Sequence, residues 1–104
     1  MKAISIKAQI KKAVHNYMPD AKVYLYGSRA RNKSNKLSDW DVLILLNEEN
    51  ISSDLERKIA HSLYDIEFDT GELISPMIYT YKDWETKYKV TPFYKNIVKE
   101  MIEL

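Results

Sequence analysis

Apolar side chains recur at the three- and four-residue spacing of an amphipathic helix in two stretches of the first two thirds of the chain. The first stretch, residues 3–17, ends before Pro19, which cannot continue a helix. The second begins with a capping box at Ser53–Glu56 and runs to about Phe68, and Gly71 follows shortly after its end. The pattern therefore predicts two helices that each bury one face.

The last quarter of the chain predicts two further helices. Residues 82–88 suit a short helix, and Thr91 followed by Pro92 is typical of the first two positions of a longer one. The apolar residues expected on that last helix are Phe93, Ile97, Val98, Met101 and Ile102.

Three other stretches are rich in the β-branched, aromatic and aliphatic residues of strands. Residues 22–26 stop at Gly27, residues 39–46 are apolar enough at their far end for a central strand, and residues 73–80 form the third. Pro76 cannot donate to a sheet ladder, which favours an edge position for that third strand or a bulge at the proline. The order of elements predicts a small α/β (α+β) domain, with helices packed on a mixed sheet of three to four strands.

The composition suits one domain over residues 1–104. The chain is 45% hydrophobic and 30% charged, which fits a single core and leaves no room for a separate substrate domain. The longest uninterrupted apolar run, residues 42–46, is too short to span a bilayer, so no membrane association is expected. The start of the chain is interrupted by lysines and lacks a secretory signal, and cysteine is absent, so we expect a cytoplasmic protein without thiol chemistry.

Charge is divided unevenly along the chain. Residues 1–36 hold nine lysines and arginines against one acidic residue, a charge of +8, whereas residues 37–104 hold seven basic and fourteen acidic residues, a charge of −7. A basic segment followed by carboxylates favours an anion-binding region, although the same charges also suit solvated helix faces.

The Gly-Ser pair after the first strand is the first candidate for chemistry. Gly27 permits a close backbone approach or a positive φ, and Ser28 and the amides that follow it can face an anion. Residues 28–38 predict a loop or a short helix, in which Arg29 and Arg31 either neutralise phosphate or remain solvated. Taken alone, a glycine and a serine after a strand predict only a turn.

Asp39 and Asp41 are the second candidate. Residues i and i+2 of a strand point to one side, so both carboxylates are expected together at the entrance of the strand. Their repulsion favours a bound cation, and a hard ion such as Mg²⁺ prefers oxygen ligands. An isolated Asp-x-Asp more often caps a turn, but the next residues on that side are Leu43 and Leu45, so Asp41 begins a face that is otherwise buried.

The spacing of the two candidates resembles a known signature, that of nucleotidyltransferases of the DNA polymerase beta superfamily and in particular of the minimal nucleotidyltransferases. The motif here consists of Gly27-Ser28, ten further residues, and Asp39-Trp40-Asp41. The order of predicted elements is similar to that family over essentially the whole chain. The resemblance implies that Gly27 and Ser28 hold the triphosphate of a nucleotide such as ATP, and that Asp39 and Asp41 bind Mg²⁺ and are the catalytic residues. It also implies attack of a hydroxyl on the α-phosphate, with pyrophosphate leaving.

The chain departs from that family at one position. Many members place a third carboxylate on the following strand, where Ser75 stands here. A serine is neither a strong metal ligand nor a general base at neutral pH, so nucleotide binding is better supported than turnover. Glu67, Asp69 or Glu72 could substitute, although surface charge is the simpler interpretation of these three.

The other polar and aromatic residues give weaker signals. His15 and His61 lie on different predicted helices, without another histidine or cysteine at ligand spacing. Tyrosines on predicted strands are expected there for packing, so nucleic-acid binding is not expected. One small core does not account for the aromatic residues near the C-terminus, Trp84, Tyr88 and Phe93. They predict an apolar patch that binds a partner.

Two classes of function remain. The first is a Mg²⁺-dependent enzyme that transfers a nucleoside monophosphate, AMP from ATP by the resemblance, to a hydroxyl on a partner protein. The second is a nucleotide-binding partner or regulatory module with little or no turnover. The resemblance connects them, because minimal nucleotidyltransferases pair with small helical HEPN-type proteins, and some act as antitoxins by adenylylating that toxin. The acceptor, the nucleobase and the oligomeric state, a homo-oligomer included, stay open.

Overall fold

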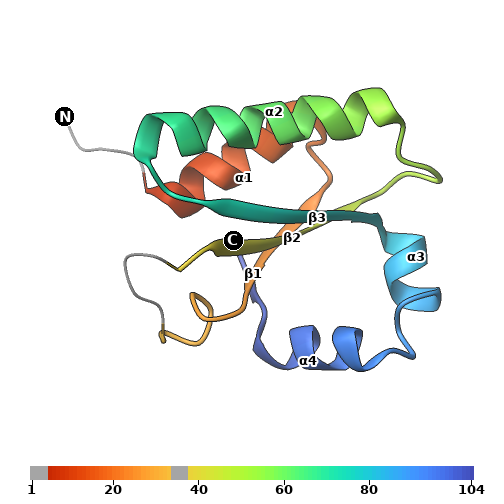
Figure 1. Cartoon of the computed structure of the whole chain (residues 1–104). Coiled ribbons are helices and arrows are strands. Elements are labelled where there is room, and N and C mark those ends of the chain that lie inside the picture. The colour runs from red at the N-terminus through yellow and green to blue at the C-terminus, as the bar shows by residue number, and fades with distance from the viewer. Residues whose placement is uncertain (1–4, 34–37) are drawn as a thin grey trace.

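The computed structural model describes residues 5–33 and 38–104, which form a four-stranded mixed sheet with helices on both faces (Figure 1). The strands are β1 (Lys22–Tyr26), β2 (Trp40–Leu46), β3 (Ile74–Thr80) and β4 (Ile102–Glu103). Their order is β3-β2-β1-β4, in which β1 is antiparallel to β2 and β4, and β2 is parallel to β3. The mixed sheet, the central place of β2 and the edge place of the strand with Pro76 are all confirmed.

Helices cover both faces of this sheet (Figure 1). The helices α1 (Ile6–Tyr17) and α2 (Ser53–Thr70) lie on one face, and α3 (Tyr81–Thr86) and α4 (Pro92–Glu100) lie on the other. Alternation along β2 sends Val42, Ile44 and Leu46 to the α1/α2 face and Leu43 and Leu45 to the α3/α4 face, and all five are buried. Each face therefore has its own hydrophobic core, which corrects the expectation of a single core. In the described part of the chain, no helix has the length and apolar character needed to cross a bilayer.

Two helix starts differ slightly from the sequence prediction. Ser5 caps α1, so the helix begins directly after it, and the predicted helical residues 3–4 lie outside the described part. Ser52, not Ser53, caps α2, because its hydroxyl accepts the N–H of Leu55 at 3.1 Å. Two adjacent serines offer the same capping chemistry, so the sequence alone does not decide between them.

The C-terminal helix is shorter than the sequence predicts. Thr91 caps it as expected, but it ends at Glu100. Ile102, predicted on the helix, instead pairs with Leu25 in β4. Hydrophobic periodicity cannot distinguish a last helical turn from a following strand of two residues. This short strand places the end of α4 beside the end of β1.

The C-terminal aromatic residues build the core on the α3/α4 face. Trp84 is 1% exposed, and its ring centre lies 4.8 Å from that of Tyr94 and 6.0 Å from that of Tyr79. Tyr88 packs against Tyr79, and Phe93 packs edge-on against Trp84. The prediction that Trp84 and Tyr88 belong to a partner patch is therefore wrong, because the second face of the sheet requires their apolar volume. Phe93 keeps 38% of its surface exposed.

Candidate functional site

A tight turn after β1 forms one side of the candidate site. Gly27 has φ 76°, in the left-handed region, and its carbonyl accepts the N–H of Arg31 at 3.2 Å. The segment predicted as a loop or short helix therefore starts with a single helical turn, and its residues 34–37 lie outside the described part. Ser28 is half-buried at the first position of this turn.

The space beside Gly27 is filled by a carboxylate. The pairing of β1 with β2 sets Tyr26 opposite Asp41, which brings the following glycine against the Asp41 side chain. A Cβ at position 27 would overlap Asp41 Oδ2 and lie 3.2 Å from its Cγ. Glycine is thus required here both by the backbone conformation and by the neighbouring carboxylate.

Asp39, Asp41 and Ser75 meet where β2 begins. The parallel register of β2 and β3 sets Asp41 opposite Ser75, and Ser75 Oγ donates to Asp39 Oδ2 at 3.1 Å. Asp39 is exposed, whereas Asp41 is half-buried and begins the side of β2 that continues into the core at Leu43. The structure therefore brings the Gly-Ser turn, the two aspartates and Ser75 together.

The carboxylate pair has the electrostatics of a cation site. Burial and the charge of Asp39 raise the pKa of Asp41, and Glu100 adds to this effect while Arg31 opposes it. Carboxylates that repel one another favour a cation between them, and oxygen is the ligand atom that Mg²⁺ prefers. Within residues 5–33 and 38–104, no three histidine, cysteine, aspartate or glutamate side chains form a metal-binding group. The residues present fit a divalent ion that takes its other ligands from phosphate and water, as Mg²⁺ commonly does.

Glu100 gives no signal in the sequence, yet it enters this site from the end of α4. Its Oε1 accepts the Gly27 N–H at 3.0 Å, and its Oε2 accepts a hydrogen bond from Arg31 Nη1 at 2.6 Å. The hydrogen bond from Arg31 is the main cause that holds the pKa of Glu100 below its ordinary value. These partners are 73 and 69 residues away in the sequence, so no local pattern could have indicated the contact.

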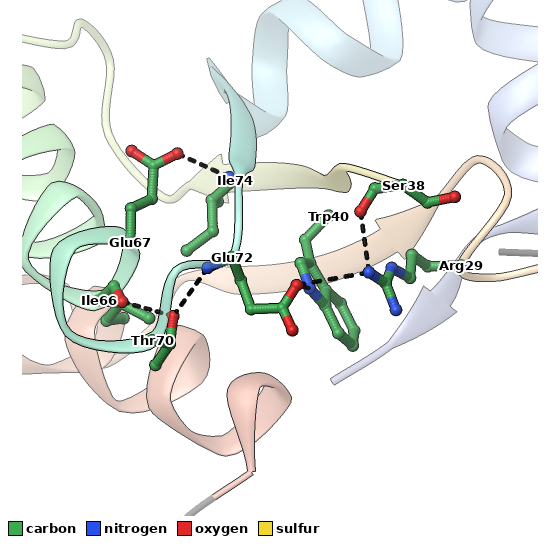
Figure 2. A network of polar contacts seen from close by, with 8 residues as sticks. All are labelled: Arg29, Ser38, Trp40, Ile66, Glu67, Thr70, Glu72 and Ile74. Atoms are coloured by element: carbon green, nitrogen blue, oxygen red, sulfur yellow. Dashed lines mark hydrogen bonds and ion pairs between the residues drawn. The ribbon is translucent and has the colours of Figure 1, made fainter. Parts of the chain in front are cut away.

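Arg29 belongs to a network on the other face of the sheet (Figure 2). Its Nη2 donates to the Ser38 carbonyl at 2.9 Å and to Glu72 Oε2 at 3.4 Å. Its guanidinium carbon lies 4.3 Å from the centre of the Trp40 ring, and Trp40 Nε1 donates to the same Glu72 oxygen at 3.2 Å. The network lies at the start of β2, on the face opposite to the carboxylates. Its contacts correct the expectation that Arg29 neutralises phosphate or remains solvated, because they engage its guanidinium and the side chain is only 15% exposed.

The acidic residues considered as replacements for the third carboxylate have other environments. Glu67 Oε2 accepts the backbone N–H of Ile74 at 2.8 Å, at the start of β3 (Figure 2). Glu72 is engaged by Arg29 and Trp40, and Asp69 is exposed on the last turn of α2. Two of these three residues therefore have structural partners of their own.

Replacing Arg29 with alanine is expected to lower the free energy of unfolding by about 1–3 kcal/mol, because Glu72 loses its charged partner and Trp40 loses the cation above its ring. The side chain of Arg29 is only 15% exposed, so water replaces these contacts poorly. Denaturant unfolding measures the change. Lys82→Ala, which breaks a largely exposed pair with Glu49, is the control and should change stability by less than about 0.5 kcal/mol.

Comparisons with known proteins identify the family and the fold of the chain. The family model described as "Polymerase beta, Nucleotidyltransferase" matches residues 8–101. A crystal structure of a toxin-antitoxin with AMP-PNP has a TM-score of 0.65 at 13% identity, covering 95% of this chain and 72% of that chain. A mutant of the toxin-antitoxin MntA-HpeT has a TM-score of 0.63 at 11% identity, covering 95% of this chain and 71% of that chain. At these identities the two structures show a shared fold. No curated protein sequence matches the chain.

Proposed function

The chain belongs to the polymerase beta nucleotidyltransferase family, and on this premise we propose that it binds a nucleoside triphosphate between the Gly27–Ser28 turn and the Asp39/Asp41 pair. The observation that carries the proposal is the packing of the Gly27 turn directly against Asp41. This packing sets backbone amides and the Arg31 guanidinium, which suit phosphate oxygens, beside carboxylates that suit Mg²⁺. One anionic ligand and one cation could therefore be held side by side.

The proposed reaction is transfer of AMP from ATP to a hydroxyl group. The hydroxyl oxygen forms a bond to the α-phosphorus, the bond from that phosphorus to the pyrophosphate oxygen breaks, and the hydroxyl proton passes to solvent or base. Asp39 and Asp41 would hold a Mg²⁺ ion, which would supply Lewis-acid stabilisation of the developing charge. Ser75 orients the Asp39 carboxylate through its hydrogen bond. Gly27, Ser28 and Arg31 hold the phosphates.

We propose that the acceptor hydroxyl belongs to a second protein. The structural neighbours are toxin-antitoxin structures, one of them with AMP-PNP, which supports both a nucleotide and a protein partner. In this proposal the chain acts as a single minimal domain in the cytoplasm, as the antitoxin of a helical HEPN-type toxin. Asp39 lies on the exposed side of the carboxylate pair, where a macromolecular acceptor can reach the nucleotide.

A nucleotide-binding or regulatory role with little turnover is the second candidate, and Ser75 favours it. This residue lies beside Asp39 and opposite Asp41, where many family members place a third carboxylate. Its hydroxyl cannot accept a proton from the attacking group at neutral pH. The two candidates share the nucleotide site and differ in whether AMP is transferred.

The purified chain is expected to bind ATP with Mg²⁺ yet to transfer no measurable AMP to water or small alcohols. Holding the acceptor in the right orientation lowers the barrier to group transfer by several kcal/mol, on the order of 7 kcal/mol or more in favourable cases. The partner protein would provide this orientation. The measurement is incorporation of label from α-labelled ATP, with and without a co-expressed small helical protein of the HEPN type.

Label on the co-expressed protein, absent with Asp41→Asn, supports the transferase. Nucleotide binding without label on that protein favours the regulatory candidate. Efficient modification of a small molecule such as an aminoglycoside by the chain alone would refute the requirement for a protein acceptor.

A further inference from the structure

The carboxylate of Glu100 lies against the Gly27 turn. One of its oxygens accepts the Gly27 N–H at 3.0 Å and the other accepts from Arg31 at 2.6 Å. Both donors belong to the group that the proposed function assigns to phosphate. A carboxylate offers two negatively charged oxygens to these donors much as a phosphate does.

We propose that Glu100 is a built-in competitor of the triphosphate, so that nucleotide binds only when this carboxylate withdraws from Gly27 and Arg31. The inference rests on the proposed nucleotide site and adds a regulatory element to it. A phosphate oxygen that accepts the Gly27 N–H would lie beside the Glu100 oxygen, where two like charges repel. Nucleotide binding must therefore break the Glu100 contacts first, and the free energy of these contacts makes the free energy of nucleotide binding less favourable by the same amount.

A metal-binding role for Glu100 is less well supported than this competition. Its carboxylate accepts hydrogen bonds from the Arg31 guanidinium and the Gly27 N–H, two donors that suit an anion. Among the side chains that the structure describes, no set of three acidic or histidine residues is placed to hold a metal. Glu100 therefore acts on the phosphate side of the site, whereas Asp39 and Asp41 form the cation side.

The Glu100 side chain can withdraw while the backbone stays in place. Ile97 anchors α4 in the core at 4% exposure, and Glu100 is the last residue of the helix. Met101 and Leu104, on either side of β4, pack against the two cores, and the Leu104 N–H donates to the Val23 carbonyl at 2.8 Å. The backbone around Glu100 is therefore held on both sides. Withdrawal of the carboxylate needs a change of rotamer in one side chain at the helix end, not unfolding of α4.

The two glycines of the chain allow a direct test, because labelling with ¹⁵N-glycine gives one backbone amide signal from Gly27 and one from Gly71. The Gly71 N–H donates to the Glu67 carbonyl at the end of α2, so its signal is an internal reference. The wild type and Glu100→Gln are titrated with ATP and Mg²⁺ and, separately, with inorganic pyrophosphate. Glu103→Gln is the matched control, since it removes the same charge from the same segment, where Glu103 forms an exposed ion pair with Lys22.

Glu100→Gln is expected to shift the Gly27 signal before any ligand is added, to leave the Gly71 signal in place, and to bind ATP and pyrophosphate about fivefold or more tightly than the wild type. Glu103→Gln is expected to do none of these. Binding by Glu100→Gln where the wild type binds too weakly to measure also supports the inference.

Wild-type binding that is unchanged or weakened by Glu100→Gln would overturn the inference while leaving the proposed function standing. Weakened binding would make Glu100 a positioning residue for Arg31. Absence of ATP binding in the wild type and in Glu100→Gln alike would contradict the proposed function itself, and the inference with it.

Discussion

Replacing Asp41 with asparagine is expected to remove the Mg²⁺-dependent part of nucleotide binding and to leave the chain folded. Asp41 is the half-buried member of the carboxylate pair, and asparagine keeps its shape without its charge. Loss of one of two charged ligands should weaken ATP binding in Mg²⁺ by about a hundredfold or more, since even changes to residues behind metal ligands cost about 10–100-fold. Calorimetric titration with ATP, in Mg²⁺ and in its absence, measures the effect.

The same substitution is expected to maintain or raise the melting temperature of the nucleotide-free chain. Burial and Asp39 raise the pKa of Asp41 in the folded state, so stability falls as the pH rises from the ordinary carboxyl pKa through this raised value. At neutral pH the ionised Asp41 therefore opposes folding, and asparagine relieves the repulsion. Asp65→Asn, on an exposed part of α2, is the control for charge alone. A folded Asp41→Asn with wild-type affinity for ATP in Mg²⁺ would contradict the assignment.

Replacing Gly27 with valine is expected to abolish nucleotide binding and to lower the free energy of unfolding by about 1–3 kcal/mol. A φ of 76° is strained for a β-branched residue, and the new Cβ would overlap Asp41 Oδ2. The Asp41 carboxylate must then move away from the turn, so the phosphate side and the cation side of the site are both disturbed. Thermal unfolding and calorimetric titration give the two effects separately.

Gly71→Val is the matched control for Gly27→Val. Gly71 has the same φ of 76°, but a Cβ there would meet nothing within 4 Å. The control therefore carries the backbone strain without the overlap, and it should lose stability while keeping its affinity for nucleotide. Wild-type affinity in Gly27→Val would mean that the turn is only a connector between two strands.

The sheet and the aspartate pair could be predicted because each depends on local pattern. Alternation along β2 places Asp41 on the same side as the buried Leu43, which marks an acidic residue at the mouth of an apolar face. A strand followed by Gly27 predicts a turn, and the antiparallel pairing of β1 with β2 then brings that turn to Asp41. Little beyond strand periodicity and one pairing is needed to assemble this half of the site.

The parts that the sequence did not predict depend on contacts between distant segments. Glu100 reaches Gly27 only because α4 and β4 return to β1, and an acidic residue near a helix end has no local signature of that contact. Ile102 has the same apolar character in a helix or in a strand, so its pairing with Leu25 decides the outcome. If the sheet had one core, Trp84 would be an extra apolar residue at the surface. Because helices cover both faces of the sheet, Trp84 is buried in the second core.

The nucleotide site at the Gly27 turn is best tested by calorimetric titration of the 104-residue chain with ATP, CTP, GTP and UTP, each with and without Mg²⁺. We expect saturable binding of a nucleoside triphosphate that tightens with Mg²⁺, because the cation relieves the repulsion between Asp39, Asp41 and the phosphates. Binding of none of the four nucleotides at millimolar concentration in Mg²⁺ would contradict a nucleotide site at the Gly27 turn.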